Sequence, residues 1–276
     1  MQQYTYATIL SIGGSDSGGG AGIQADIKTI SALGCFATTA ITAITAQNTV
    51  EVIALHILTP EIVRAQLEAV LSDIRPQAIK IGMIPTGGHA SVIADVLKSH
   101  PLIPVIFDPV MITSTGQQLM ADECLSIIRE CLLPQITLLT PNIDEAALLT
   151  GMPIQSLGDM KDAALRIVKL NCKAVLVKGG HLGSNILFDV YLDQDGNQEV
   201  FESVKIDSFN THGTGCSLSS AIAAYIARGN NMPASIRLGL SYIYEAIAAG
   251  ENVKTGHGHG PLNHFFDPQK MQKISK

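Results

Sequence analysis

Residues 7–33 read ATILSIGGSDSGGGAGIQADIKTISAL, and this stretch decides the fold class. The apolar run Ala7–Ile12 has the length and composition of a buried strand, and the glycine cluster Gly13–Gly22 follows it directly. A helix then extends to about Leu33, and Gly34 suits the left-handed position that ends such a helix. A strand that passes through a glycine-rich turn into a helix is typical of an α/β protein with a parallel sheet.

The same alternation continues along the chain. Thr59-Pro60-Glu61 is a helix-start signature: a capping hydroxyl, a proline at the first helical position and an acid in the first turn. The other expected strands are Cys35–Thr45, Val50–Leu58, Ala78–Ile81, Val105–Phe107, Ile136–Leu139, Ala174–Val177 and the hairpin Ile186–Leu192 with Glu199–Val204. The other expected helices are His89–Lys98, Asp122–Leu133, Ile143–Leu149, Met160–Leu170, Thr214–Arg228 and Pro233–Ala249. We therefore expect one α/β domain over residues 1–276, with a parallel sheet covered by helices on both faces.

Composition excludes several classes of protein. The 276 residues are 46% hydrophobic and only 15% charged, which excludes a disordered chain. The net charge is −6, Lys and Arg form no cluster and Trp is absent, so we expect neither a nucleic-acid nor a membrane partner. Five widely spaced cysteines without a C-x-x-C pair indicate a reducing compartment, and no signal-peptide pattern opens the chain. A cytoplasmic location is the resulting expectation.

Glycine, proline or polar residues follow six of the expected strands at the point where each strand ends. They occupy positions 13–16, 47–48, 82–83, 108–109, 141–142 and 178–180. Ligands of open parallel sheets bind beyond the carboxyl ends of the strands. Each of these segments alone is an ordinary polar loop, but the six together predict a binding site at that edge.

The first glycine loop contains a G-x-G-x-x-A match, residues 20–25, between a strand and a helix. That pattern is typical of dinucleotide binding, but the acid expected about 20 residues downstream is missing. A P-loop is excluded because the chain has no Gly-Lys dipeptide. We favour glycines that let the backbone approach a small ligand, with Asp16 and the loop amides holding it.

A second glycine loop, residues 210–217, reads NTHGTGCS and precedes a helix rich in small residues. Gly213 and Gly215 leave amides uncovered at a helix start, which favours an anion and stabilises a phosphoryl group during transfer. Cys216 lies in the first turn, where the helix dipole lowers a thiol pKa, so it is a candidate base for a substrate hydroxyl. The alternative is a small buried cysteine without a chemical role.

Three other residues are candidates for binding phosphates or a metal. Glu145 follows a strand and Pro141, where an acid binds magnesium or simply favours the helix dipole. Asp108 lies at a strand end, where it binds a metal or phosphates or caps the next turn. Lys178 either places a cation near phosphates or is an ordinary solvated lysine. The tract at residues 256–261, GHGHGP, resembles a metal site in composition only, because its glycines leave the imidazoles unpositioned.

Taken together, these motifs resemble those of one family. The segments are 14–26 (GSDSGGGAGIQAD), 46–49 (AQNT), 80–83 (KIGM), 108–111 (DPVM), 140–145 (TPNIDE), 177–181 (VKGGH) and 211–216 (THGTGC). In this order they resemble the hydroxymethylpyrimidine/phosphomethylpyrimidine kinases of thiamine biosynthesis, which are ribokinase-superfamily enzymes related to pyridoxal kinases. The resemblance covers nearly the whole chain. It implies a three-layer α/β/α sandwich, usually a homodimer, that uses ATP and Mg²⁺.

The resemblance also implies a reaction and a set of site residues. The γ-phosphoryl group of ATP passes to the hydroxymethyl oxygen of 4-amino-5-hydroxymethyl-2-methylpyrimidine, and a second transfer to the monophosphate gives the diphosphate. The implied catalytic residues are Cys216, Gly213 and Gly215. The implied substrate-binding residues are Gln47, Met83, Gly20, Ala21, Gly22, Asp26 and Val110. The implied nucleotide-binding residues are Asp108, Asn142, Lys178, His212 and Thr214, and the implied metal-associated acids are Glu145 and Asp108.

The chain departs from the family pattern at one position, and three other functions are compatible with parts of its sequence. Many members carry a lysine where this chain has Ser114, so a cation for the substrate's phosphate is missing there. A pyridoxal kinase is the closest enzymatic alternative, and a small-ligand or nucleotide-binding module is the non-enzymatic one. An oxidoreductase would need a nicotinamide cofactor, which we do not expect.

Overall fold

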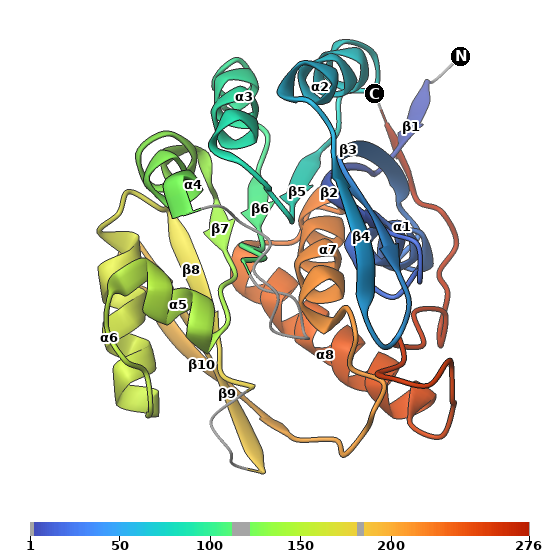
Figure 1. Cartoon of the computed structure of the whole chain (residues 1–276), viewed down its shortest axis with the longest axis vertical. Helices are drawn as coiled ribbons and strands as arrows, with labels where there is room; N and C mark the ends of the chain where they lie inside the picture. Colours follow the sequence, from blue (N-terminus) through green and yellow to red (C-terminus); the bar gives the residue numbers. More distant parts are fainter. Residues whose placement is uncertain (1–2, 112–121, 181–184, 276) are drawn as a thin grey trace.

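The computed structural model describes residues 3–111, 122–180 and 185–275, and its central feature is a twisted β-sheet (Figure 1). In the described residues the sheet has nine strands in the order β10-β9-β8-β7-β6-β5-β2-β3-β4. Their bounds are β2 Thr8–Asp16, β3 Phe36–Gln47, β4 Val52–Ile57, β5 Ala78–Ile81, β6 Val105–Phe107, β7 Leu138–Leu139, β8 Ala174–Lys178, β9 Ile186–Asp193 and β10 Gln198–Val204. A separate antiparallel pair joins β1 (Tyr4–Tyr6) to β11 (Lys273–Ser275) near the two ends of the chain.

Six strands of the sheet are parallel, and antiparallel strands extend both edges. β2 pairs in parallel with β3 on one side and with β5 on the other, whereas β4, β9 and β10 are antiparallel to their neighbours. The chain runs outward from β2 to β3 and β4 and then returns to β5. The strand order therefore reverses between β2 and β5, which is where open α/β sheets bind ligands.

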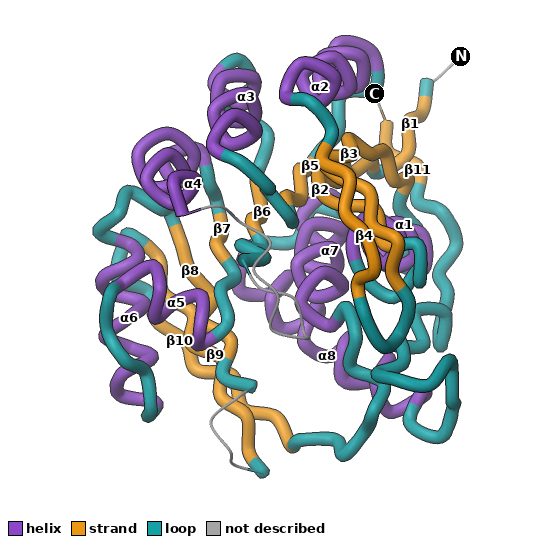
Figure 2. Tube along the Cα trace, viewed as in Figure 1, coloured by secondary structure: helices purple, strands orange, loops and turns teal. Residues whose placement is uncertain are grey.

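Helices cover both faces of the sheet, which confirms the expected three-layer α/β/α arrangement (Figure 2). One face packs against α2 Pro60–Asp73, α3 Gly87–Lys98, α4 Asp122–Ile127 with its continuation η1 Ile128–Leu132 and η2 Leu133–Gln135, α5 Ile143–Thr150 and α6 Leu157–Val168. The other face packs against α1 Gly22–Ala32, α7 Thr214–Ala227 and α8 Met232–Gly250. No helix in the described ranges has the length and apolar composition that a membrane crossing needs.

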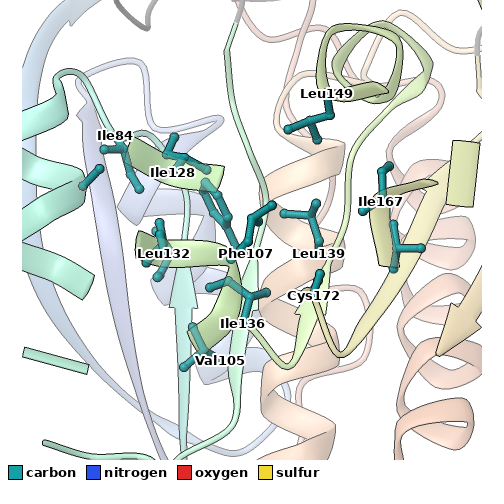
Figure 3. Close-up of a cluster of buried hydrophobic side chains, with 14 of the residues drawn as sticks. Ile84, Val105, Phe107, Ile128, Leu132, Ile136, Leu139, Leu149, Ile167 and Cys172 are labelled. Carbon is teal, nitrogen blue, oxygen red and sulfur yellow. The ribbon is translucent and has the colours of Figure 1, made fainter. Parts of the chain in front are cut away.

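The two buried cores follow the alternation of side chains along each strand. In β6, Val105 and Phe107 join one core and Ile106 joins the other. Figure 3 shows the first of these cores, in which Phe107 and Leu139 of the sheet lie among helix side chains. Strands buried on both faces explain the uninterrupted apolar runs in the sequence.

The expected helices and strands are confirmed, with differences that matter at the sheet edge. β2 continues through Gly13–Asp16, which we predicted as loop, because these residues keep pairing with β3 across a register shift after Gly13. β7 has two residues instead of four, since the Ile136 amide still bonds to the Leu133 carbonyl of the preceding turn. Thr59 caps α2 as predicted.

Candidate active site

A cavity of about 640 Å³ opens at the carboxyl edge of the sheet, beside the point where the strand order reverses. Its walls come from the ends of β2, β3, β5, β6 and β8, the start of α5 and the start of α7. Nearly all site residues predicted from the sequence line it: Ala21, Gly22, Gln47, Met83, Asp108, Val110, Asn142, Glu145, Lys178, His212, Gly213, Thr214, Gly215 and Cys216. Gly20 and Asp26 do not.

The start of α7 presents backbone amides to this cavity, because the first amides of a helix have no partner within it. Gly213 caps the helix with φ 83°, and a Cβ at this position would overlap the carbonyl of Gly20. A Cβ on Gly215 would lie 3.2 Å from both Asp108 Oδ2 and Lys178 Nζ. Glycine at both positions therefore lets the helix start approach its neighbours closely, with its positive dipole end facing the cavity.

The two glycine loops are joined through Asp16. Its carboxylate accepts hydrogen bonds from the amides of Gly18 (2.8 Å), Gly20 (3.1 Å) and Ala21 (2.8 Å), and His212 Nε2 lies 3.1 Å away. Burial alone would raise the Asp16 pKa, but these bonds, the one with His212 foremost, lower it. Asp16 lines the cavity while these amides bind its carboxylate, and the expectation that Asp16 and the loop amides hold a ligand stays a prediction. Gly20 lies outside the lining, and its Cβ would overlap the His212 ring.

An ion pair lies on the opposite wall from the first glycine loop. Lys178 Nζ, at the end of β8, is 2.7 Å from Asp108 Oδ1, at the end of β6, and the Thr140 hydroxyl donates to the same oxygen at 3.2 Å. Burial disfavours the ammonium, yet Asp108 and Glu145 raise the Lys178 pKa above its ordinary value. Lys178 is therefore an ammonium, and the pair adjoins the α7 start through Gly215.

Glu145 combines a structural role with a place in the lining. Its Oε2 accepts the Asn142 amide at 2.7 Å while Asn142 Oδ1 accepts the Glu145 amide at 2.9 Å, a capping box at the start of α5. Burial raises the Glu145 pKa to about 7, Asp108 adds to this shift and Lys178 opposes it. This acid is therefore easily protonated until a cation approaches it.

The described residues form no cluster of three or more metal-binding side chains. Mg²⁺ in kinases keeps several waters and uses one or two carboxylates together with substrate phosphates. Asp108 and Glu145 line the same cavity, and Asp108 helps to raise the pKa of Glu145, so their donor set fits a hydrated ion shared with phosphates rather than a protein-only cage.

The position of Cys216 agrees with the prediction, but the direction of its pKa shift does not. Cys216 lines the cavity in the first turn of α7, as expected, but burial raises its pKa to about 11. Lys80 and the Gly22 amide oppose this shift, whereas Asp26 and Asp108 add to it. The prediction that the helix dipole lowers the thiol pKa is therefore wrong, because desolvation and two nearby carboxylates outweigh the dipole.

The end of the cavity at Gln47 adjoins the first glycine loop. Gln47 ends β3, with its Oε1 accepting the Thr45 hydroxyl at 3.1 Å and its Nε2 lying 3.4 Å from His212 Nε2. A Cβ on Gly14 would lie 3.0 Å from Met83 Sδ, so this glycine makes room for the thioether. Val110 also lines the cavity, with its amide bonded to the Asp108 carbonyl.

Asp26 lies behind the cavity wall, and sequence reasoning missed its partner. Asp26 is fully buried and binds Lys80 Nζ, which is 2.9 Å from each carboxylate oxygen. Lys80 itself lines the cavity. The available signal was a lysine at a position of the apolar strand 78–81 where the alternation requires a buried side chain. Ser114 and His181 lie outside the described residues.

The fold is that of the ribokinase-like small-molecule kinases. The phosphomethylpyrimidine kinase family model matches residues 16–263, and the chain belongs to this family. The hydroxymethylpyrimidine/phosphomethylpyrimidine kinase of Bacillus subtilis is 42% identical over 257 residues, which are 93% of this chain and 94% of that protein.

Two solved structures are similar to the chain. The phosphomethylpyrimidine kinase of Clostridium difficile superposes with a TM-score of 0.78 at 40% identity, over 87% of this chain and 99% of that one. The ADP complex of Bacillus subtilis pyridoxal kinase has a TM-score of 0.86 at 34% identity, over 94% of this chain and 98% of that one. The likeness therefore includes kinases named for two different vitamins or vitamin precursors.

Proposed function

We propose that this chain is an ATP-dependent kinase of thiamine biosynthesis. It phosphorylates the hydroxymethyl group of 4-amino-5-hydroxymethyl-2-methylpyrimidine and then converts the monophosphate to the diphosphate. The observation that carries the proposal is the start of α7, whose amides lie beside the Lys178–Asp108 pair in one cavity with Gln47. Family membership supports the same reaction.

The order of the strands leaves room for two substrates. β8, which ends at Lys178, and β3, which ends at Gln47, are five strand positions apart. At the usual spacing this is a span of roughly 24 Å. We place the nucleotide at the Lys178 end, with Asp108, Asn142 and Thr214, and the pyrimidine at the Gln47 end, with Met83, Val110, Ala21 and Gly22. His212, which the resemblance implies as a nucleotide residue, lies 3.4 Å from Gln47 and therefore belongs to the pyrimidine end. The acceptor oxygen then lies near the start of α7, between the two ends.

In the first transfer, the hydroxymethyl oxygen forms a bond to the γ-phosphorus while the bond to the β,γ-bridging oxygen breaks and ADP leaves. Negative charge spreads over the equatorial oxygens, where the amides of Gly213, Gly215 and Cys216 stabilise it. Mg²⁺ held by Glu145 and Asp108 neutralises charge on the phosphates when it is bound. The hydroxyl proton passes to the thiolate form of Cys216.

A coupled ATPase assay tests this proposal with the pyrimidine alcohol, its monophosphate and pyridoxal as acceptors, each with and without Mg²⁺. We expect Mg²⁺-dependent turnover with the first two acceptors. A protein that binds nucleotide without catalysis would give no turnover with any of them, and this result would refute the proposal.

Pyridoxal kinase is the second candidate, favoured by the 34% identity to the Bacillus subtilis pyridoxal kinase over nearly the whole chain. Gln47 favours the aminopyrimidine, because its amide donates to a ring nitrogen and accepts from an exocyclic amino group at once. A kcat/KM for pyridoxal above that for the pyrimidine alcohol would reverse our choice.

We also propose that the protein is a cytoplasmic homodimer that associates through β4. Ile53, Leu55 and Ile57 occupy alternate positions on one side of this strand and are 68%, 37% and 40% exposed. An edge strand with such an apolar row is prone to association. The five cysteines are free thiols, which fits a reducing compartment.

A further inference from the structure

Lys80 is a buried cation that faces the acceptor end of the cavity. It lies on β5, at the reversal of strand order, and its side chain is only 1% exposed. It nevertheless belongs to the cavity lining. A Cβ on Gly82 would lie 2.9 Å from Lys80 Nζ, so the glycine leaves the ammonium open on that side.

A network of four elements fixes this ammonium in place. Asp26 of α1 accepts two bonds from Lys80 Nζ at 2.9 Å, one from Ser11 Oγ of β2 at 2.5 Å and one from Ser220 Oγ of α7 at 2.8 Å. These bonds use the lone pairs of the carboxylate. An ammonium has three donors, and within the described residues the bonds of Lys80 Nζ go to Asp26. One donor is left for the cavity.

The two lysines of the cavity lining differ in their charged neighbours. Among the described lining residues Lys80 and Lys178 are the lysines, and there is no arginine. Lys178 is bound to Asp108 beside Gly215, at the nucleotide end. Both ammonium groups interact electrostatically with Cys216 in the first turn of α7, and both also interact with Asp108. In the strand order, β5 with Lys80 is two positions from β3, which ends at Gln47, and three from β8, which ends at Lys178, so Lys80 is the lysine nearer the proposed acceptor end.

The two acceptors of the proposed reaction differ in charge. The hydroxymethyl group is neutral, whereas the phosphate of the monophosphate is an anion that must enter a cavity already containing Asp108 and Glu145. A fixed ammonium donor stabilises the anion far more than the alcohol, because only the anion adds the Coulomb attraction of an opposite charge to the hydrogen bond. We propose that Lys80 binds the acceptor phosphate in the second transfer and thereby makes the monophosphate a substrate.

This inference rests on the proposed function and adds the residue that recognises the second substrate. In that step a phosphate oxygen of the monophosphate forms the bond to the γ-phosphorus, the bond to the β,γ-bridging oxygen breaks, and ADP leaves. The attacking dianion carries no proton to remove. Lys80 therefore acts by holding the acceptor and by screening its repulsion from the nucleotide.

The test compares kcat/KM for the monophosphate with kcat/KM for the alcohol. Lys80→Met combined with Asp26→Asn removes both charges and keeps an amide for the two serine hydroxyls, which avoids an unpaired buried carboxylate. Lys80→Gln is the second variant, because it keeps a donor to Asp26 without the charge. Lys98→Met removes the same charge from the exposed end of α3 and serves as the matched control.

We expect the kcat/KM ratio of monophosphate to alcohol to fall by about 30-fold or more in whichever Lys80 variant folds, as judged by thermal unfolding, and to stay unchanged in the control. A purely structural role would lower both values together, so a ratio within about threefold of wild type overturns the inference. If the wild-type protein phosphorylates neither acceptor, the proposed function itself fails. If it phosphorylates both and the variants leave the ratio unmoved, only the role of Lys80 fails.

Discussion

At the scale of single residues, Cys216 shows how surroundings decide chemistry. Its place at a helix start favours a thiolate, but burial and the carboxylates of Asp26 and Asp108 raise its pKa to about 11. A base of this kind works through a small thiolate fraction. Below the pKa, that fraction increases about tenfold for each unit of pH.

We therefore expect kcat for the pyrimidine alcohol to rise with pH between about pH 7 and pH 9, and Cys216→Ala to lose both this slope and about 10²-fold in kcat. The measurement is a pH–rate profile of the two proteins, with Cys131→Ala on η1 as the control that keeps the wild-type profile. A flat wild-type profile, or a loss below threefold, would leave Cys216 as a lining residue.

Gln47 is expected to affect substrate binding more than chemistry. Gln47→Ala removes one donor and one acceptor from the pyrimidine end, so KM for the pyrimidine should rise by about 3–10-fold per lost hydrogen bond. KM for ATP should stay unchanged, as should both constants in the exposed control Gln194→Ala. Steady-state kinetics in both substrates decide this, and an unaltered pyrimidine KM would remove Gln47 from the pocket.

The sequence predicts a cavity residue correctly when the residues next to it in the chain form a recognisable motif. Gly213, Gly215 and Cys216 belong to a single loop at the start of a helix, so their proximity is local. Lys80 was missed because its partner Asp26 is 54 positions away in the chain, and Ser220, which binds the same carboxylate, is 194 positions from Asp26. The pKa of Cys216 was missed for the same reason.

At the scale of elements, the start of α7 depends on glycine at two positions for different reasons. Gly213 needs its positive φ of 83°, whereas Gly215 needs only space beside the ion pair of Asp108 and Lys178. Alanine is otherwise the better helix residue, by about 1 kcal/mol in a helix interior. A substitution of Gly215 by alanine is therefore expected to lower turnover without lowering the free energy of unfolding.

Gly215→Ala should fold with nearly unchanged thermal stability and lose about tenfold or more in kcat, because its methyl group displaces the ion pair and the adjacent amides. The control is Gly158→Ala on α6, where the added Cβ would meet Ser156 Oγ at an ordinary 3.5 Å. Calorimetry together with kcat tests the pair of variants. Wild-type turnover in Gly215→Ala would show that the close approach is not needed.

Periodicity and turn residues predicted most elements, because strands buried on both faces and capped helices leave strong local signals. The continuation of β2 through Gly13–Asp16 left none, since glycine is a poor strand former and its pairing is supplied by β3. Likewise, the bonds from Asp16 to its own loop depend on how that loop closes on His212. Such contacts follow from tertiary structure rather than from local preference.

At the scale of the whole molecule, the sheet has two roles: it forms the hydrophobic cores, and it forms the cavity where the strand order reverses beside β2. The faces supply the two hydrophobic cores, while the carboxyl edge supplies the cavity. The sequence predicted this division, because six strands end in polar or glycine residues. It did not give the order of the strands, which depends on crossovers that no local pattern records.

The proposed dimer belongs to this scale as well. Ile53→Lys places a charge in the apolar row of β4 and should shift the protein from dimer to monomer at micromolar concentration. Leu102→Lys, at a position that is 93% exposed and away from β4, should leave the mass unchanged. Light scattering coupled to gel filtration measures both, and a wild-type monomer would exclude the dimer.

The pairing of β1 with β11 has a consequence for engineering. Tyr4 lies opposite Ser275, so the two ends are adjacent, at the amino edge of the sheet and away from the cavity. A short linker could close the polypeptide into a ring, and new termini could be opened at the Asp195–Gly196 tip of the β9–β10 hairpin. Such a circular permutant would keep every cavity residue in its original strand, helix or loop.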